Sequence, residues 1–222
     1  MVNILIILTA LLGTSISFRP PIVAPAELTS VQFQNFEKHA QSRLPAYEKY
    51  FKRFAGQYGI PWTLLAAVAY QESKWDNSAR SPTGVRGLMQ ITEQTAQHIG
   101  LENRSNAVES IKGGAFYLNY LFQKTPPHLL TSQRWTLALA GYNIGWGHVR
   151  DAYRLSAKLK LNANRWDDMK SVLPLLEEKE FYSELIYGFA RGSETVDFVE
   201  NVFVYFNFLN QRLSPGTQIA RL

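Results

Sequence analysis

The spacing of apolar residues is the feature that most constrains the fold of this chain. From about Thr29 onward they recur every three to four positions, and no segment shows the sustained alternation of a β-strand. Short groups of Gly, Pro, Ser and Asn separate the periodic stretches, as loops separate helices. With 222 residues, of which 46% are hydrophobic, the chain can bury the core of one domain. The sequence therefore predicts an all-α fold.

The same groups of loop-forming residues set the bounds of the expected helices. Pro61 stands where a first helical turn accepts proline, so a strongly apolar helix is expected at 62–73. The stretch 76–86, rich in Ser, Asn, Pro and Gly, is expected to be a loop. Further helices are expected at 29–42, 45–57, 92–100, 105–124, 132–142, 148–159, 167–176, 179–189 and 194–211.

The N-terminal segment differs from the rest of the chain. Residues 2–18 carry no charged side chain, and the apolar stretch 4–12 has the length of a signal-peptide core rather than of a membrane-spanning helix. The small-x-small sequence at 15–17 is typical of a cleavage site. We expect residues 1–18 to direct export to the periplasm or cell envelope, either removed as a signal peptide or kept as a short membrane anchor. A buried core helix is the alternative.

The remaining chain divides into three parts. Residues 19–42 are expected to form a linker and an amphipathic helix, because three prolines precede the first helical periodicity. Residues 43–213 are expected to form the main domain, and residues 214–222 a tail.

Composition excludes several kinds of chemistry. The chain has no cysteine, which rules out disulfides, thiolate catalysis and Cys-ligated metal sites. The four histidines lie apart without the spacing of ligands, so no metal or other cofactor is expected: His39, His98, His128 and His148. The net charge of +5 permits an anionic partner. No helix face carries a dense basic stripe, so no nucleic acid is expected.

Glu72 is the carboxylate that stands out. It follows Val68 by four positions and Leu65 by seven, which places it in register with the apolar residues of the expected helix. Burial and the negative end of a helix both disfavour a charged carboxylate, so its pKa should rise. A glutamate that keeps its proton near neutral pH is suited to act as a general acid. The alternative is a partly exposed helix-end glutamate paired with Lys74 or Arg80.

Two neighbouring segments contain groups suited to binding a sugar. The Ser73 hydroxyl is expected near the carboxylate, and Gly87 allows close approach of the backbone to a ligand. Leu88, Met89 and Gln90 then place an amide beside apolar groups, which suits the N-acetyl and hydroxyl groups of a sugar.

Tyr142 and Asn143 end an apolar helix just before a glycine turn, and we expect their polar ends to face a cleft. A core tyrosine and a capping asparagine are the alternative interpretation. Trp75 and Trp146 are further candidates for stacking on a sugar.

In order and spacing, Glu72-Ser73, the sequence GVRGLMQ at 84–90 and GYNIG at 141–145 resemble the catalytic domain of the lytic transglycosylases of bacterial peptidoglycan. That family shares the fold of goose-type lysozyme. From about Arg43 to Leu213 the chain is most similar to the catalytic half of the family's membrane-bound F members. The resemblance implies a lysozyme-like helical domain with a substrate groove for peptidoglycan glycan strands.

The resemblance also implies residue roles and a reaction. Glu72 would be the catalytic acid that cleaves the bond between N-acetylmuramic acid and N-acetylglucosamine and leaves a 1,6-anhydro end. The substrate-binding residues would be Ser73, Gly87, Leu88, Met89, Gln90, Tyr142 and Asn143.

Alternatives are a peptidoglycan hydrolase (a muramidase) and a catalytically weak glycan-binding domain. A hydrolase needs a second carboxylate, and the nearest, Asp76, is expected to be a loop or capping residue.

Two positions depart from the family pattern. Gly141 replaces an alanine, which loosens the end of the helix. Phe198 replaces a tyrosine whose hydroxyl bonds the catalytic glutamate in the family. Tyr205 lies two helical turns away, about 10 Å, too far to substitute for it. Either the loss lowers activity or Tyr142 serves in place of the missing tyrosine.

Overall fold

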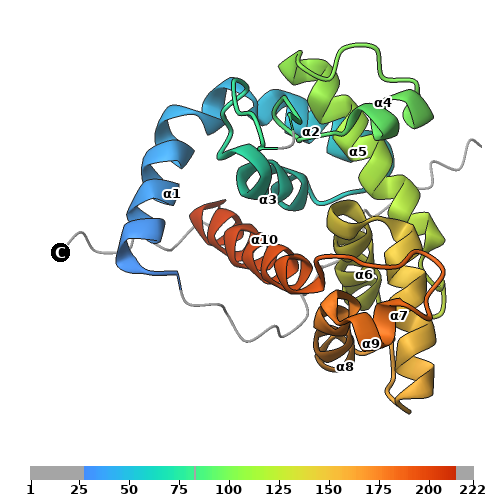
Figure 1. Ribbon diagram of the computed structural model, residues 1–222. Coiled ribbons are helices and arrows are strands. Elements are labelled where there is room, and N and C mark those ends of the chain that lie inside the picture. Colours follow the sequence, from blue (N-terminus) through green and yellow to red (C-terminus); the bar gives the residue numbers. More distant parts are fainter. Residues whose placement is uncertain (1–27, 83, 214–222) are drawn as a thin grey trace, which may run out of the picture.

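The protein is described here from a computed structural model, whose described part comprises residues 28–82 and 84–213 (Figure 1). Within it every regular element is helical, and the β structure is limited to an isolated bridge between Arg80 and Arg86. The expectation of an all-α fold is confirmed. The expected export segment at 1–18 and the expected tail at 214–222 lie outside the described residues.

The helices of the described part follow one another along the chain, and the connection from α3 to α4 is long. They are α1 (Ser30–Ser42), α2 (Glu48–Tyr58), α3 (Trp62–Ser73), α4 (Glu93–Ile99), α5 (Ala107–Lys124), α6 (Thr131–Ile144), α7 (Trp146–Lys158), α8 (Trp166–Val172), α9 (Lys179–Tyr182) and α10 (Gly192–Leu213). Two 3₁₀ turns, η1 (Leu44–Ala46) and η2 (Leu173–Glu177), precede α2 and α9.

Helix α3 is the centre of the core. Residues 63–70 are all buried, because α2 and α10 pack against this helix and α5 touches it as well. Figure 1 shows α3 beside α10, with α1 at one end of the pair and α6 to α9 at the other. A helix enclosed on every face has no polar side, which explains its nearly unbroken apolar sequence.

A smaller apolar cluster holds α7, α8 and η2 together. It contains Leu155 of α7, Met169 and Val172 of α8, and Leu173 and Leu176 of η2. No helix in the described part is both long enough and apolar enough to span a membrane.

The expected helix at 179–189 is wrong beyond its first turn. Helix α9 ends at Tyr182, and residues 183–191 follow an irregular path. The fully buried Asp151 of α7 accepts the backbone N–H groups of Ile186 and Tyr187, so these donors are unavailable to a helix. Gly188 then takes a φ of +73°, which helical backbone does not use.

Smaller differences between the expected and the observed helix bounds come from local capping and from proline. Helix α5 is capped by the side chain of Asn106, which accepts from the N–H groups of Val108 and Glu109, and not by Ser105. The helix expected from Pro45 is divided into η1 and α2. The expected bounds of 62–73 agree with those of α3, and Thr92 caps α4 as expected.

Candidate active site

Glu72 lies in the last turn of α3 and is partly exposed. Burial raises the pKa of this carboxyl from 4.5 to about 8, and the ammonium of Lys74 opposes the rise. No hydrogen bond or ion pair joins Glu72 to another residue in the described part of the chain, so the expected alternative of a pair with Lys74 or Arg80 is not formed. The side chain therefore keeps a proton at neutral pH and remains accessible to a ligand.

Lys74 terminates α3 in the left-handed conformation, with a φ of 54°. Its ammonium lies 4.8 Å from the ring centroid of Tyr70 and 5.3 Å from that of Tyr205. Burial lowers the pKa of Lys74 to about 8, while the negative charge of Glu72 raises it. Tyr205 also stacks on Phe36, so its ring belongs to this aromatic cluster.

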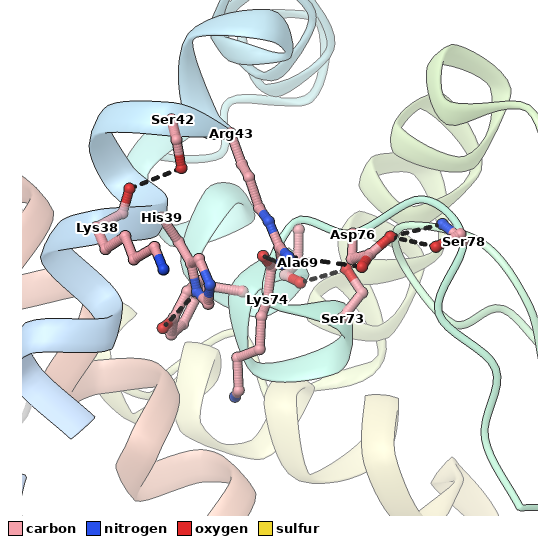
Figure 2. Close-up of polar contacts among 10 residues, drawn as sticks. Lys38, His39, Ser42, Arg43, Ala69, Ser73, Lys74, Asp76 and Ser78 are labelled. Carbon is pink, nitrogen blue, oxygen red and sulfur yellow. Dashed lines mark hydrogen bonds and ion pairs between the residues drawn. The ribbon is translucent and has the colours of Figure 1, made fainter. Parts of the chain in front are cut away.

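The turn after Glu72 is held by polar contacts from Arg43, the residue that follows α1 (Figure 2). Arg43 donates to the carbonyl oxygen of Lys74 at 3.0 Å and pairs with Asp76 at 3.6 Å. The other oxygen of Asp76 accepts the backbone N–H and the hydroxyl of Ser78. Asp76 is therefore the turn residue that its sequence position predicts, and these contacts fix the direction in which the chain leaves α3.

Hydrogen bonds connect the segment 84–90 to α3, α5 and α6. The hydroxyl of Ser73 donates to the carbonyl oxygen of Leu88 at 2.8 Å. The backbone N–H of Met89 donates to the hydroxyl of Ser110 at 3.1 Å, and the Met89 carbonyl accepts the hydroxyl of Tyr142 at 2.9 Å. These hydrogen bonds hold the C-terminal end of α3, the loop and the candidate cleft tyrosine together.

Position 87 accepts only glycine without strain. Its φ is +92°, and a Cβ at this position would lie 2.1 Å from the carbonyl oxygen of Arg104. Gln90 also has a positive φ, 45°, and its side-chain amide donates to the carbonyls of Gly87 and Ala79 at 2.8 and 3.3 Å. Because the amide is used within the loop, Gln90 shapes the loop rather than reaching out from it.

Tyr142 connects Glu72 to a cavity. Its ring is parallel to that of Phe198 at 6.4 Å between centroids and lies 5.5 Å from that of Tyr117. Burial raises the pKa of Tyr142 well above its usual value, and the charge of Glu72 adds to the rise. The carboxyl and the phenol are therefore electrostatic neighbours. Phe198 contributes its ring to this contact but has no hydroxyl to donate.

The cavity has a volume of about 440 Å³. It is lined by Thr92, Gln94, Thr95, His98, Tyr117, Tyr142, Asn143, Ile144 and Gly145. Glu72 is not part of this lining and adjoins it through Tyr142. Asn143 is exposed, and its side-chain oxygen accepts the hydroxyl of Thr195 at 2.7 Å, which orients the amide at the rim.

Five of the expected binding residues fall into two groups in the structure. Tyr142 and Asn143 line the cavity. Ser73, Leu88 and Met89 are buried, with exposures of 6%, 0% and 0%, so their side chains support the site from beneath rather than face a ligand.

The structure excludes one of the two tryptophan candidates for stacking on a sugar. Trp75 is wrong as a cleft residue, because it is 1% exposed and its indole N–H donates to the carbonyl of Ala66 at 2.8 Å. Trp146 is half-buried and packs against Gly141.

The sequence motifs do not predict that α4 lines the cavity. The sequence indicates a helix cap at Thr92 and a surface or capping role for His98, and it does not single out Gln94 or Thr95. The available signal was position: α4 begins directly after the loop that ends at Gln90, so its first turn lies beside that loop. No cluster of three or more metal-binding side chains occurs among residues 28–82 and 84–213.

Residues 49–164, a little over half of the chain, match the family model described as the transglycosylase SLT domain. The chain belongs to this family, as the resemblance in its motifs implied.

The chain is also similar to individual proteins. It is 46% identical over 202 residues to the membrane-bound lytic murein transglycosylase F of Shewanella woodyi, covering 86% of this chain and 42% of that protein. It is 47% identical over 188 residues to that of Pseudomonas fluorescens, covering 83% and 39%. The chain thus spans about two fifths of the length of these relatives.

Among solved structures, the 70 kDa soluble lytic transglycosylase of Escherichia coli matches with a TM-score of 0.59 and 22% identity, over 83% of this chain and 27% of that one. This similarity shows the fold.

Proposed function

We propose that this domain is a peptidoglycan lytic transglycosylase. It would cleave the β-1,4 bond between N-acetylmuramic acid and N-acetylglucosamine and leave a 1,6-anhydro end. The observation that carries the proposal is the environment of Glu72: an accessible carboxyl, beside the phenol of Tyr142, whose pKa burial raises to about 8. Membership of the SLT family and similarity to lytic murein transglycosylases support it.

The reaction requires one carboxyl group that gives and then regains a proton. Glu72 protonates the bridging glycosidic oxygen as the bond from that oxygen to the anomeric carbon breaks, with assistance from the substrate's own N-acetyl group. The ionised Glu72 then takes the proton of the 6-hydroxyl as its oxygen bonds to the anomeric carbon. The acid is restored, and no water is consumed.

The number of carboxyl groups at the site also distinguishes the proposed reaction from hydrolysis. Inverting and retaining hydrolases ordinarily use two carboxylates flanking the bond. In the described residues the charged group that shifts the pKa of Glu72 is Lys74, a cation, and the nearest carboxylate in sequence, Asp76, is used by Ser78 and Arg43. This arrangement favours attack by the substrate's own hydroxyl.

The placement of each residue supports a proposed role in binding. Tyr142 and Asn143 would contact the strand at the cavity, together with the α4 residues on its other side. Gly87 and Gln90 would maintain the loop that carries the backbone close to the substrate. Ser73, Leu88 and Met89 would act from beneath as positioning residues.

We also propose that the domain works in the bacterial envelope, exported by residues 1–18, either with that segment removed or with it retained for membrane association. The charge-free apolar stretch supports this location, as does similarity to proteins named membrane-bound.

Mass spectrometry of the released fragments tests the reaction. Digestion of purified peptidoglycan should give fragments with 1,6-anhydro ends, because the attacking hydroxyl belongs to the sugar itself. The matched control is the same peptidoglycan digested by a muramidase, which gives reducing ends heavier by one water. Reducing ends from this domain would replace the proposal by hydrolysis.

The pH dependence of kcat/KM tests the protonation state of Glu72. Because burial raises the pKa of Glu72 to about 8, the group is protonated at pH 7 and loses its proton as the pH rises through about 8. Activity should therefore fall above about pH 8 and show no loss from this group between pH 5 and 7. A decline that begins near 4.5, the ordinary value, would contradict the assignment.

A further inference from the structure

The chain leaves α3 through two consecutive residues in the left-handed conformation. Lys74 and Trp75 have φ angles of 54° and 55°, and neither is a glycine. This conformation is unfavourable for a residue with a Cβ, and it persists only where surrounding contacts enforce it. Lys74 follows Glu72 by two positions, so the contacts that hold this turn also hold the last turn of α3.

Arg43, the residue that ends α1, holds the peptide group between the two left-handed residues (Figure 2). Its guanidinium donates to the carbonyl oxygen of Lys74 at 3.0 Å. That oxygen belongs to the planar peptide group that joins Lys74 to Trp75, so the bond restrains the backbone dihedral angle on each side of it. The guanidinium also lies 3.6 Å from the carboxylate of Asp76, but both side chains of this ion pair are partly exposed, so it contributes less than the bond to the carbonyl.

The side chain of Trp75 is held by α3 and by α1. It is 1% exposed, and its indole N–H donates to the carbonyl oxygen of Ala66 at 2.8 Å. Its ring lies 5.8 Å from that of Phe36 in α1, measured between centroids. Helix α1 and its cap therefore act on this turn twice, on the ring through Phe36 and on the backbone through Arg43.

Helix α1 is itself attached to α10. Phe36 stacks on Tyr205 of α10 with 5.4 Å between centroids, and Glu37 pairs with Arg212 of the same helix. Figure 1 shows α1 across one end of α3 and α10. Because its helix is anchored, Arg43 presents its donors from a fixed position.

We propose that Arg43 is a positioning residue for the cleavage reaction: it fixes the strained turn after α3 and thereby the direction in which the Glu72 carboxyl points. The proposal rests on the proposed function, because that carboxyl has to meet the glycosidic oxygen. A displacement of about 1 Å in a reacting group can cost about 10²-fold in rate. Arg43 precedes residue 49, where the match to the SLT family begins, so this role lies outside the matched segment.

The location of Arg43 separates an effect on kcat from an effect on KM. Arg43 does not line the cavity in which Tyr142 and Asn143 are proposed to bind the strand. The pKa of Glu72 is raised by burial and lowered by the charge of Lys74, and Tyr142 is its titratable neighbour from α6. Loss of Arg43 should therefore leave binding and these charges in place, and alter where the carboxyl points and how well water is excluded from it.

Arg43→Met tests the proposal, because methionine keeps much of the aliphatic stem and removes the donors. At pH 6 its kcat for release of soluble peptidoglycan fragments should fall about tenfold, with KM within about twofold of that of the unsubstituted domain. Arg43→Lys keeps one charged donor without the planar fork, so it should recover part of the loss. A turn that is held less firmly admits water to Glu72, so the alkaline fall in kcat/KM should begin below about pH 8 in Arg43→Met.

Arg134→Met is the matched control. Arg134 also donates to a carbonyl oxygen near a helix end, that of Phe122 in α5 at 3.0 Å, and it does not line the cavity. Urea unfolding should show a loss of stability in both methionine variants, whereas only Arg43→Met should lower kcat and move the pH profile. If Arg43→Met folds poorly, Arg43→Lys provides the same comparison.

The inference is overturned if Arg43→Met has the kcat of the unsubstituted domain, if Arg134→Met lowers kcat equally, or if KM rises while kcat stays constant. It is also overturned if the alkaline fall stays at about pH 8, or if Arg43→Lys is no more active than Arg43→Met.

The proposed function fails separately, by the absence of anhydro products from the unsubstituted domain. In that case carbon-13 NMR of the Glu72 carboxyl, assigned by comparison with Glu72→Gln, still tests the positioning without a substrate. The pKa of Glu72 should be lower in Arg43→Met than in the unsubstituted domain, and an unchanged value would show that Arg43 does not hold this turn.

Discussion

Glu72→Gln is expected to abolish cleavage of peptidoglycan, with kcat reduced by about 10³-fold or more. Glutamine keeps the size of the side chain and cannot supply a proton to the glycosidic oxygen. General acid–base catalysis contributes about 10² to 10⁴ to a rate, and in the proposed reaction Glu72 serves in both roles. Zymography on purified cell wall and the rate of release of soluble fragments measure the effect.

The isosteric control is Glu102→Gln. Glu102 is an exposed residue between α4 and α5 that takes no part in the site, so this variant should clear the cell wall at the rate of the unsubstituted domain. Equal clearing by Glu72→Gln and the unsubstituted domain, or no clearing by either, would defeat the enzymatic proposal. If neither variant cleared the cell wall, the domain would be a glycan-binding domain without catalytic activity. The missing hydroxyl at Phe198 is the feature that favours this alternative.

The same substitution should change stability in a pH-dependent way. The pKa of Glu72 in the folded protein is raised to about 8, above the ordinary 4.5, so the contribution of this group is fully present below pH 4.5 and is lost as the pH rises through about 8. Glutamine does not titrate. Urea unfolding should therefore show that Glu72→Gln gains stability relative to the unsubstituted domain between pH 5 and pH 8.

Gly87→Ala is expected to destabilise the domain by at least about 2 kcal/mol and to reduce activity with it. An alanine in the left-handed region costs about 1–2 kcal/mol by itself. The added Cβ would also lie 2.1 Å from a backbone oxygen of Arg104, so the loop must move. That movement would displace Met89, whose carbonyl oxygen accepts the hydroxyl of Tyr142. Chemical denaturation and the rate of peptidoglycan release measure the two effects.

Gly56→Ala provides the control with the opposite sign. Gly56 lies on the exposed side of α2, and a Cβ there meets nothing within 4 Å. Alanine should stabilise this helix by about 0.5–1 kcal/mol and leave activity unchanged. If Gly87→Ala unfolded at the same denaturant concentration as the unsubstituted domain, the loop would be more adaptable than its contacts indicate.

Helix positions were predictable because their signals are local. The bounds of α3 and the cap of α4 follow from residues within one turn of each helix end. The prediction at 179–189 failed because the deciding contact is not local: Asp151 takes the N–H groups of residues 35 and 36 positions away. A helical spacing of apolar residues contains no information about such an acceptor.

The apolar register of Glu72 explains only part of its environment. Helical spacing places Glu72 in register with Val68 and Leu65, but residues 63–70 of α3 are buried on every face, so the register does not distinguish one side of the helix from another. Its partial exposure depends instead on what surrounds the last turn of α3. There Tyr142 of α6 and the loop around Met89, 53 residues apart, meet at a hydrogen bond.

The sequence alone determined the helical class, the position of most helices and the residue types of the three motifs, because periodicity and capping act within a few residues. The tertiary structure decided which side chains are exposed and where the cavity lies: it buries Ser73, Leu88 and Trp75, and it forms the cavity from α4, α5 and α6. Exposure and pKa depend on the neighbours that surround a side chain. Those neighbours come from distant parts of the chain, so they exist only once the helices have packed.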